Sequence, residues 1–466
     1  MRLGAMIPET MQHAMLVLLL HSFLGCSPNP HASKQGSPDV VAPPPTASSS
    51  TVETESAADT GALDADPDGD DDPTDTGQGP LPDEGHFERV GKAPLSLRRI
   101  CDLTVFRDAL YGAHAYEPLD MDGATISRYQ PDADPKPFQV AFDWNRPGEP
   151  AQKGGAGQGF IRVHSIGKRL YVPDADPPYN GFGITDPGTE GFVFVSDANG
   201  DFAPARMPHH LPPLPPDDQG HAGAGLIPRA YHVLDVIRFR GRLYASTGSV
   251  PPGERAWHGA APGALHVANA DGSRWTYEVD YPFPWRDGVW RLTFLVRFRG
   301  KLFAGMQDFD GNDPNDYVVF DPPAGTSVIE RKDVHPTRAT QTGGSNTLRW
   351  FADGGRLYWI AMSREGTFLR VTQDGEDWKV ISFPKFAGRP SDVTRFRGAL
   401  VVLTERGLFR LDQDTPVQIA KVRSLDGRSP FESSDFFCSA PLAAYRNELY
   451  AGGQREGSLY KLVAEH

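Results

Sequence analysis

One pattern of apolar and polar positions recurs along the chain from Arg98 onward. Each copy begins as an apolar strand, passes through a tight turn and resumes as a second strand. The second strand carries Leu followed by an aromatic residue or Val, and these leucines lie 43 to 73 residues apart: Leu110, Leu170, Leu243, Leu302, Leu357, Leu400 and Leu449. Turn pairs such as Arg-Gly and Arg-Asn suit hairpins, because Gly and Asn tolerate positive φ. The pattern therefore predicts seven antiparallel hairpins.

A second hairpin follows the first in several copies. Its tip is clearest at residues 372–378, TQDGEDW, and related tips begin near Ser196 and Asn269. These tips resemble the Asp-box of sialidase-like propellers, Ser/Thr-x-Asp-x-Gly-x-x-Trp, with the Gly one place early. In such a hairpin the Asp accepts backbone N–H bonds and the Trp packs between sheets. Repeat and resemblance together predict an all-β fold, a seven-bladed β-propeller of four-stranded antiparallel blades over residues 87–466, with six or eight blades as alternatives.

The two ends of the repeat region are expected to meet. The last copy supplies three strands, and residues 87–92 have the pattern of an outer strand, so we expect them to complete the last blade. Cys101 and Cys438 lie near the start of the innermost strand in the first and last copies. In an exported protein this placement predicts a Cys101–Cys438 disulfide, and two buried free thiols are the alternative.

Residues 1–26 resemble a bacterial lipoprotein signal. A short apolar core at residues 15–20 is followed by Leu24-Gly25-Cys26, and no apolar run is long enough to span a bilayer as a helix. The resemblance implies that Cys26 carries the lipid, with plain secretion as the alternative. We therefore expect a cell-envelope protein, held to a bacterial membrane by its lipid alone and facing the periplasm or the exterior.

Residues 27–86 are expected to form a disordered linker rich in Pro, Ser and Asp. The segment 27–84 contains thirteen acidic residues and one lysine, so it carries −12 of the chain's formal net charge of −14. It has almost no aromatic residues and cannot bury enough apolar surface to offset the entropy of ordering. The negative charge of the whole chain argues against a nucleic-acid partner.

The loops that follow the second strand of each hairpin are long in the first four copies and short in the last three. Unequal loops on one face of a rigid ring are where binding usually occurs, so we expect a glycan or a protein to bind there. Tyr179 and Trp257 are the predicted aromatic anchors, and Asp174 and Asp310 the predicted polar contacts. Oxygen-bearing side chains at alternate positions also make calcium an alternative ligand, at Asp308, Asp310 and Asn312; no other cofactor is expected.

Charged residues recur eight positions before the repeated leucine, near the start of the innermost strand. Five of the seven positions are charged, and we expect them at the mouth of a central channel: Asp102, Arg162, Asp235, Arg349 and Asp392. They could line a polar binding funnel, or they could pair with one another and fix the register of the blades.

The chain shows no catalytic signature. It lacks a Gly-x-Ser-x-Gly elbow and a His-Glu-x-x-His pair, and it lacks the Phe-Arg-Ile-Pro motif and arginine triad expected of a sialidase. The sequence therefore favours a non-catalytic binding or assembly scaffold over an enzyme. The alternative is a carbohydrate-active hydrolase or lyase at the channel mouth, which would need two facing carboxylates.

Overall fold

The structure is a computed structural model, and the chain divides into two compact units, Met1–Leu63 and Asp64–His466. All residues that the structure describes belong to the second unit. They are residues 77–93, 99–115, 124–133, 136–143, 159–175, 190–202, 224–249, 262–269, 272, 274–281, 290–308, 313–423, 427–433 and 437–465.

The described residues form an all-β arrangement. Three sheets have four strands: β2 (Arg99–Phe106), β3 (Ala109–Ala115), β4 (Thr125–Tyr129) and β5 (Phe138–Asp143); β6 (His164–Ile166), β7 (Arg169–Pro173), β8 (Glu190–Val195) and β9 (Ala224–Pro228); β10 (Ala230–Phe239), β11 (Arg242–Ser249), β12 (Gly263–Ala268) and β13 (Trp275–Asp280). Two sheets have eight strands.

The first eight-stranded sheet contains β14 (Trp290–Phe298), β15 (Lys301–Asp308), β16 (Tyr317–Phe320), β17 (Val334–Thr337), β18 (Asn346–Asp353), β19 (Arg356–Ser363), β20 (Gly366–Thr372) and β21 (Lys379–Ile381). The second contains β22 (Pro390–Phe396), β23 (Ala399–Thr404), β24 (Gly407–Asp412), β25 (Thr415–Lys421), β1 (Gly85–Lys92), β26 (Leu442–Tyr445), β27 (Glu448–Gly452) and β28 (Ser458–Ala464). Two short 3₁₀ helices are η2 (Arg331–Asp333) and η3 (Lys385–Ala387).

Each eight-stranded sheet consists of two four-stranded groups that share one parallel residue pair. In the first sheet this pair is Met306 with Asn346, and in the second it is His86 with Lys421. All other pairings within these two sheets are antiparallel. The seven predicted hairpins are present as β2–β3, β6–β7, β10–β11, β14–β15, β18–β19, β22–β23 and β26–β27.

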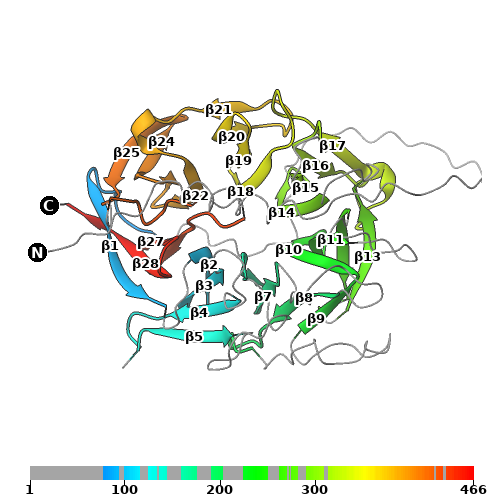
Figure 1. Ribbon diagram of the computed structural model, residues 1–466, viewed down its shortest axis with the longest axis horizontal. Helices are drawn as coiled ribbons and strands as arrows, with labels where there is room; N and C mark the ends of the chain where they lie inside the picture. Colours follow the sequence, from blue (N-terminus) through cyan, green and yellow to red (C-terminus); the bar gives the residue numbers. More distant parts are fainter. Residues whose placement is uncertain are drawn as a thin grey trace, which may run out of the picture. The chain divides into compact units, whose positions relative to one another are not determined.

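The first strands of these hairpins form a closed circuit (Figure 1). Each contacts the first strand of the next hairpin along the chain, and the last contacts the first: β2, β6, β10, β14, β18, β22 and β26. Two faces result from this arrangement. The turn face carries the turns between the first and second strands, and the loop face carries the starts of the first strands and the ends of the second strands.

The ends of the circuit join as the sequence predicted. β1 pairs antiparallel with β28, so that Phe87 lies opposite Leu462. The side chain of Phe87 is buried in an apolar cluster with Ile419, Leu442 and Tyr460. A strand from before the first hairpin therefore covers the edge of the last one, which removes an exposed sheet edge.

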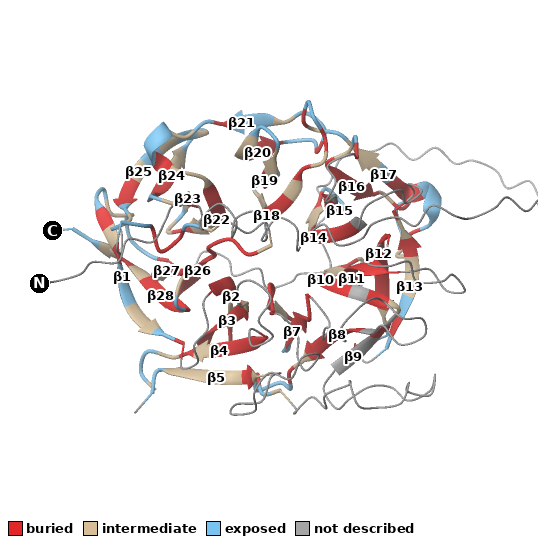
Figure 2. Cartoon of the chain, in the orientation of Figure 1, coloured by how far each residue is buried: buried red, intermediate tan, exposed pale blue. Residues whose placement is uncertain are grey.

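Apolar side chains fill the space between adjacent sheets. Phe142, Phe160 and Phe194 pack with ring centroids 5.0–5.8 Å apart and connect β5 to β8. The inner strands are largely buried, whereas outer strands are more exposed (Figure 2). In β25 exposed and half-buried residues alternate over the first four positions, which reflects the period of two along a strand with one solvated face.

The turn face is held together by arginines in a left-handed conformation. Five turns have an arginine with φ between 48° and 52°: Arg107, Arg240, Arg299, Arg397 and Arg446. Each guanidinium lies 4.9–5.8 Å from the ring centroid of the preceding aromatic residue. This conformation costs a non-glycine residue roughly 1 kcal/mol, so compensating contacts are expected.

Several of these arginines bond to the next repeat. Arg240 Nη2 donates to the carbonyl of Gly300 at 2.8 Å, and Arg397 Nη2 donates to that of Asn447 at 2.9 Å. Arg446 links the last turn to the first, because its Nε donates to Asp108 Oδ1 at 2.9 Å. The repeated phrase in the sequence thus encodes both the turn and a link to the neighbouring turn.

The hairpin tip at residues 372–378 also lies on the turn face. Asp374 Oδ1 accepts the backbone N–H groups of Glu376 and Asp377 at 2.8 and 2.9 Å. Trp378 packs against Trp359 and donates its indole N–H to Tyr317 in the neighbouring group of strands. The N–H bonds to the carboxylate lower the pKa of Asp374 to about 2.

Candidate functional site

The predicted loop-face anchors are only partly within the described residues. Cys26, Tyr179, Trp257, Asp310 and Asn312 lie outside them, and the side chain of Asp308 does too. The lipid, the aromatic anchors and the calcium alternative therefore remain predictions.

Asp174 is described and lies in the interior. Its side chain is fully buried, and Oδ2 accepts the backbone N–H of Phe192 at 2.9 Å. This bond ties the end of β7 to β8. Because the carboxylate faces the sheet interior, the predicted contact with a ligand does not fit its position, and we do not retain Asp174 as a ligand residue.

The five charged residues predicted at the channel mouth come together in the interior, and we call them the inner cluster: Asp102, Arg162, Asp235, Arg349 and Asp392. All five are less than 10% exposed. Four of them directly follow a shift in strand register: Asp102, Asp235, Arg349 and Asp392. Such bulges re-aim a side chain relative to the regular alternation.

Each aspartate of the inner cluster joins its own first strand to the next repeat. Asp102 Oδ2 accepts the N–H of Val163 at 3.0 Å. Asp235 Oδ2 accepts that of Leu295 at 2.7 Å, and Asp392 Oδ2 accepts that of Leu442, also at 2.7 Å. These bonds fix neighbouring repeats in register.

Both arginines reach across the circuit to a repeat that is not a neighbour, and Arg349 also lies near the adjacent one. Arg162, just before β6, donates to the carbonyl of Leu348 in β18 at 3.0 Å. Arg349, in β18, places Nη1 2.9 Å from Asp102 Oδ1 in β2 and Nε 3.7 Å from Asp392 Oδ1 in β22. Phe294 supports the first arginine, with its ring centroid 3.6 Å from the guanidinium carbon.

Burial and charge act in opposite directions on these groups. Burial alone would raise the pKa of Asp102, but Arg349 and Arg162 outweigh burial and hold that pKa below its ordinary value. For Asp392 burial dominates, so its pKa is raised despite Arg349. Burial and the charge of Arg349 lower the pKa of Arg162 to about 10, so both arginines are cationic at neutral pH.

The disulfide lies against this cluster. Cys101 and Cys438 have a Cα–Cα separation of 4.7 Å and an S–S distance of 2.11 Å, so the predicted pair is confirmed at disulfide distance. Both residues pack in one apolar cluster with Leu234 and Phe294. Buried, mutually paired and packed on a disulfide, the inner cluster agrees with the ion-pairing alternative rather than with an open binding funnel.

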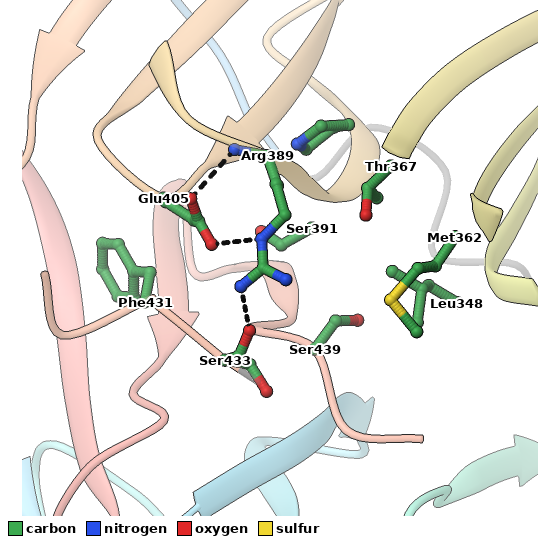
Figure 3. A pocket seen from close by; sticks show the side chains of 10 residues that line it. Leu348, Met362, Thr367, Arg389, Ser391, Glu405, Phe431, Ser433 and Ser439 are labelled. Atoms are coloured by element: carbon green, nitrogen blue, oxygen red, sulfur yellow. Dashed lines mark hydrogen bonds and ion pairs between the residues drawn. The ribbon is translucent and has the colours of Figure 1, made fainter. Parts of the chain in front are cut away.

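A pocket opens on the loop face beside the inner cluster, and we call it the Arg389 pocket. Its free volume is about 20 Å³, enough for about one water-sized group. Its lining comes from the starts of β18, β20 and β22, the ends of β19 and β23, and the segment before β26: Leu348, Met362, Thr367, Arg389, Pro390, Ser391, Glu405, Phe431, Ser433 and Ser439 (Figure 3).

Arg389 is the central charged side chain of this pocket. Its Nε donates to Glu405 Oε1 at 2.6 Å, its backbone N–H donates to Glu405 Oε2 at 3.1 Å, and Nη2 donates to the Ser433 carbonyl. Among the described residues no partner bonds to Nη1. Figure 3 shows the guanidinium between Glu405 and Ser433 on one side and Thr367 on the other.

The backbone around Arg389 is fixed by a short, well-bonded loop. Gly388 has φ 74°, and a Cβ there would lie 2.7 Å from Glu405 Oε2, so glycine permits the close approach of this carboxylate. Thr404 Oγ1 and the N–H of Arg406 both donate to the carbonyl of Ala387, at 2.7 and 3.0 Å. The charged pair is therefore held by structure rather than by chance contact.

Ser439 contributes an unsatisfied hydroxyl to the same pocket. It is 4% exposed, and its Oγ has no hydrogen-bond partner among the described residues. Ser391, by contrast, donates to the carbonyl of Leu403 at 3.2 Å. A buried hydroxyl without a partner costs free energy, so it marks a position where a ligand or water would be stabilised.

Sequence reasoning missed this pocket, because it lies where the loops are short. Arg389, Glu405 and Ser439 are separated by as many as 50 residues and share no motif. The one local signal was Gly388-Arg389-Pro390 at the start of a first strand. There a glycine and a proline bracket a charged residue in a conformation set by the backbone.

Two further findings concern the described residues alone. No group of three or more His, Cys, Asp or Glu side chains among them is placed to hold a metal ion. None of their helices has the length and apolar character needed to cross a membrane.

No protein-family model matches the chain, and no curated protein sequence matches it. Solved structures do resemble it. An inactive H270A virginiamycin B lyase from Staphylococcus aureus with quinupristin has a TM-score of 0.47 and 10% identity, with 81% of this chain and 99% of that chain covered. The Neurospora crassa Pan2 WD40 domain has a TM-score of 0.46 and 8% identity, with 84% and 98% covered.

The AfRom2 CNH domain has a TM-score of 0.42 and 10% identity, with 81% of this chain and 97% of that chain covered. These neighbours have β-propeller or WD40-like folds. At such identities the likeness concerns the fold only.

Proposed function

We propose that this protein is a non-catalytic binding scaffold whose loop face binds a protein or a glycan. We take the seven hairpins with their outer strands as seven four-stranded blades of a propeller. The first group of eight strands counts as two blades, and so does the second. The single parallel residue pair inside each of these sheets supports this division.

The observation that carries the proposal is the Arg389 pocket. It is a polar recess on the loop face, between rigid strands, and it contains a charged pair and an unsatisfied hydroxyl. Binding residues are often held on loops by a rigid frame, and a few placed polar groups then fix the orientation of the ligand. The pocket lies on the face predicted for binding, although among the copies with short loops.

The N-terminal segments complete the proposal. A lipid on Cys26 would hold the protein at the envelope, and the acidic linker would act as a spacer of some tens of ångströms. Such a spacer would leave the loop face accessible to partners beyond the membrane surface. The Asp-box likeness of the hairpin tips concerns the structure of the blades and not the ligand.

The alternative function, a carbohydrate-active hydrolase or lyase, has less support. Its acid and base would be carboxylates facing a substrate. Asp102, Asp235 and Asp392 are the candidates at the channel, but they are buried and accept backbone N–H bonds. Groups engaged in this way are poor proton donors or acceptors for an external sugar.

A glycan and peptide array tests the proposal. The Cys26→Ala variant of the full chain would serve as the soluble probe, with Arg389→Gln added in a second sample. We expect a defined set of ligands to bind the first sample and to weaken with the second. If no glycan or peptide binds the first sample above background, the scaffold proposal is wrong.

A further inference from the structure

We propose that the Arg389 pocket binds a carboxylate carried on a short apolar stem, as at the C-terminal residue of a peptide partner. This inference rests on the proposed binding function and names its ligand chemistry. It starts from the groups of the pocket that remain unsatisfied.

Both unsatisfied groups of the pocket can donate hydrogen bonds, so a ligand with acceptor oxygens would satisfy them. Arg389 uses Nε and one hydrogen of Nη2 for Glu405 and Ser433. Among the described residues, Nη1 remains available. The hydroxyl of Ser439 adds a further donor that is 4% exposed.

The cationic guanidinium favours a carboxylate over a neutral oxygen, because hydrogen bonds from arginine to an ionised acceptor are stronger than neutral ones. Nη1 and the hydroxyl of Ser439 are two donors for its oxygens. Glu405 does not compete for Nη1, because its Oε1 bonds Nε and its Oε2 bonds the Arg389 backbone N–H. Arg389 would then be shared between the carboxylate of Glu405 and the carboxylate of the ligand.

The remaining lining limits the size and polarity of the ligand. Leu348 and Met362 supply apolar surface across the pocket from the charged pair, and Phe431 lies on the side of Glu405 (Figure 3). A free volume of about 20 Å³ accommodates a single small group such as a carboxylate and not a segment of a polysaccharide. A terminal residue with an apolar side chain and a free carboxylate satisfies both the donors and the apolar wall.

Titration with three small probes tests the inference: N-acetyl-leucine, its carboxamide and N-acetylglucosamine. We expect N-acetyl-leucine to bind, and the carboxamide to bind about tenfold more weakly or worse, because it lacks the charged acceptor. Arg389→Gln and Ser439→Ala should each weaken binding of the acid. Ser439→Ala removes only an unbonded hydroxyl, so it tests the site without breaking a structural contact.

Arg410→Gln is the matched control. Arg410 also pairs with a carboxylate in the same group of strands, with Nε 2.7 Å from Asp412 Oδ1, but it does not line the pocket. Binding of the acid should be unchanged in this variant. Equal affinity for acid and carboxamide would overturn the inference, and so would loss of acid binding in Arg410→Gln to the same extent as in Arg389→Gln.

The outcomes separate this inference from the proposed function. If N-acetylglucosamine binds in an Arg389-dependent way and the acid does not, the carboxylate inference is wrong and a glycan-binding scaffold stands. If none of the probes binds while the array shows ligands, the inference is also wrong and the scaffold proposal stands. If the array itself is blank, the proposed function fails first.

Discussion

The turn face and the loop face are built from the same strands but are held together differently. On the turn face one kind of link recurs: an arginine follows an aromatic residue, turns with positive φ and bonds to the next turn, as Arg240 does to Gly300. On the loop face each contact is different. Arg162 bonds to Leu348, 186 residues later, and Arg389 bonds to Ser433.

The turn face therefore carries contacts that recur from repeat to repeat, whereas the contacts of the loop face each occur once. A link that recurs, as at Arg240, Arg397 and Arg446, needs only a short phrase of sequence, and these bonds are exposed. A contact that occurs once, such as Arg349 with Asp102, must be specified by the whole fold and is buried. Buried charge pairs are costly to break, whereas exposed pairs contribute little. Substitutions on the two faces should therefore have unequal effects.

The largest effect is expected from Arg349→Met. This change leaves Asp102 and Asp392 buried beside a neutral side chain, and breaking such a pair costs about 3–5 kcal/mol in the free energy of unfolding. Denaturant unfolding followed by tryptophan fluorescence measures the loss. Arg446→Met, on the turn face, is the matched control and should lose much less, because its pair with Asp108 is exposed. Similar losses in both variants would contradict the comparison.

The next effect is expected from removing the disulfide with Cys101→Ala and Cys438→Ala together. The bridge spans 337 residues of sequence, and loops of that length give stabilisation at the upper end of the usual range. However, β1 already joins the two ends of the circuit by pairing with β28. We therefore expect a loss of about 2–3 kcal/mol, measured by denaturant unfolding of oxidised and variant protein.

Reduction of the wild-type protein is the control for the disulfide prediction. Reduction of the wild-type protein should reproduce the loss, since it breaks the same bond without changing a side chain. A loss well above that of Arg349→Met would show that β1 does not close the circuit independently.

Most of the architecture was predictable from the sequence, because its determinants are local. The Leu-Tyr phrase identified the seven hairpins, and the two cysteines identified the bridge across the ends. The inner cluster was located by its spacing of eight before each leucine. Its partners were not predictable, because Arg349 selects Asp102 by position across the circuit and not along the chain.

The Arg389 pocket was beyond prediction for a different reason. Its lining comes from residues 348–439, and only Arg389, between Gly388 and Pro390, stands out in its local sequence. The expectation that long loops mark the site placed the anchors at Tyr179 and Trp257, which lie outside the described residues. Short loops can hold a site because they are stiff, as the bonds of Thr404 and Arg406 to Ala387 illustrate.

A smaller effect distinguishes two arginines within the turn face. Arg240 donates to four carbonyls, those of Pro322, Pro323, Thr326 and Gly300. Arg299 has nearly the same φ but no hydrogen bond from its side chain among the described residues, and only its contact with Phe298 is present. Asparagine tolerates positive φ better than arginine.

Arg240→Asn should therefore lose about 1–2 kcal/mol in unfolding free energy. Arg299→Asn should instead gain about 0.5–1 kcal/mol, because it relieves the backbone without losing a hydrogen bond. Thermal or denaturant midpoints of the two variants check this prediction. A shift in the same direction for both would mean that the left-handed arginines are not held by their links.

The smallest effect is the pH dependence of stability, which should have opposite signs for His164 and Asp374. Burial alone would lower the pKa of His164, but its pair with buried Asp235 outweighs burial and raises that pKa. A raised folded pKa means that the stabilisation is full below the unfolded value of about 6.5 and is lost as pH rises through the folded value. The difference in stability between wild type and His164→Gln should therefore shrink as pH rises above about 6.5.

The contribution of Asp374 to stability should depend on pH with the opposite sign. Its pKa falls from 3.8 to about 2 because Glu376 and Asp377 donate backbone N–H bonds to the carboxylate. A lowered folded pKa means that the stabilisation is full above the unfolded value and is lost as pH falls through about 2. The difference between wild type and Asp374→Asn should thus be constant above pH about 4 and shrink below it. Unfolding midpoints of both variants across the pH range check the pair of predictions. If the loss of stability in His164→Gln grew at alkaline pH, the charge pair with Asp235 would not be the stabilising contact. The two residues would then not differ in the sign of their pH dependence.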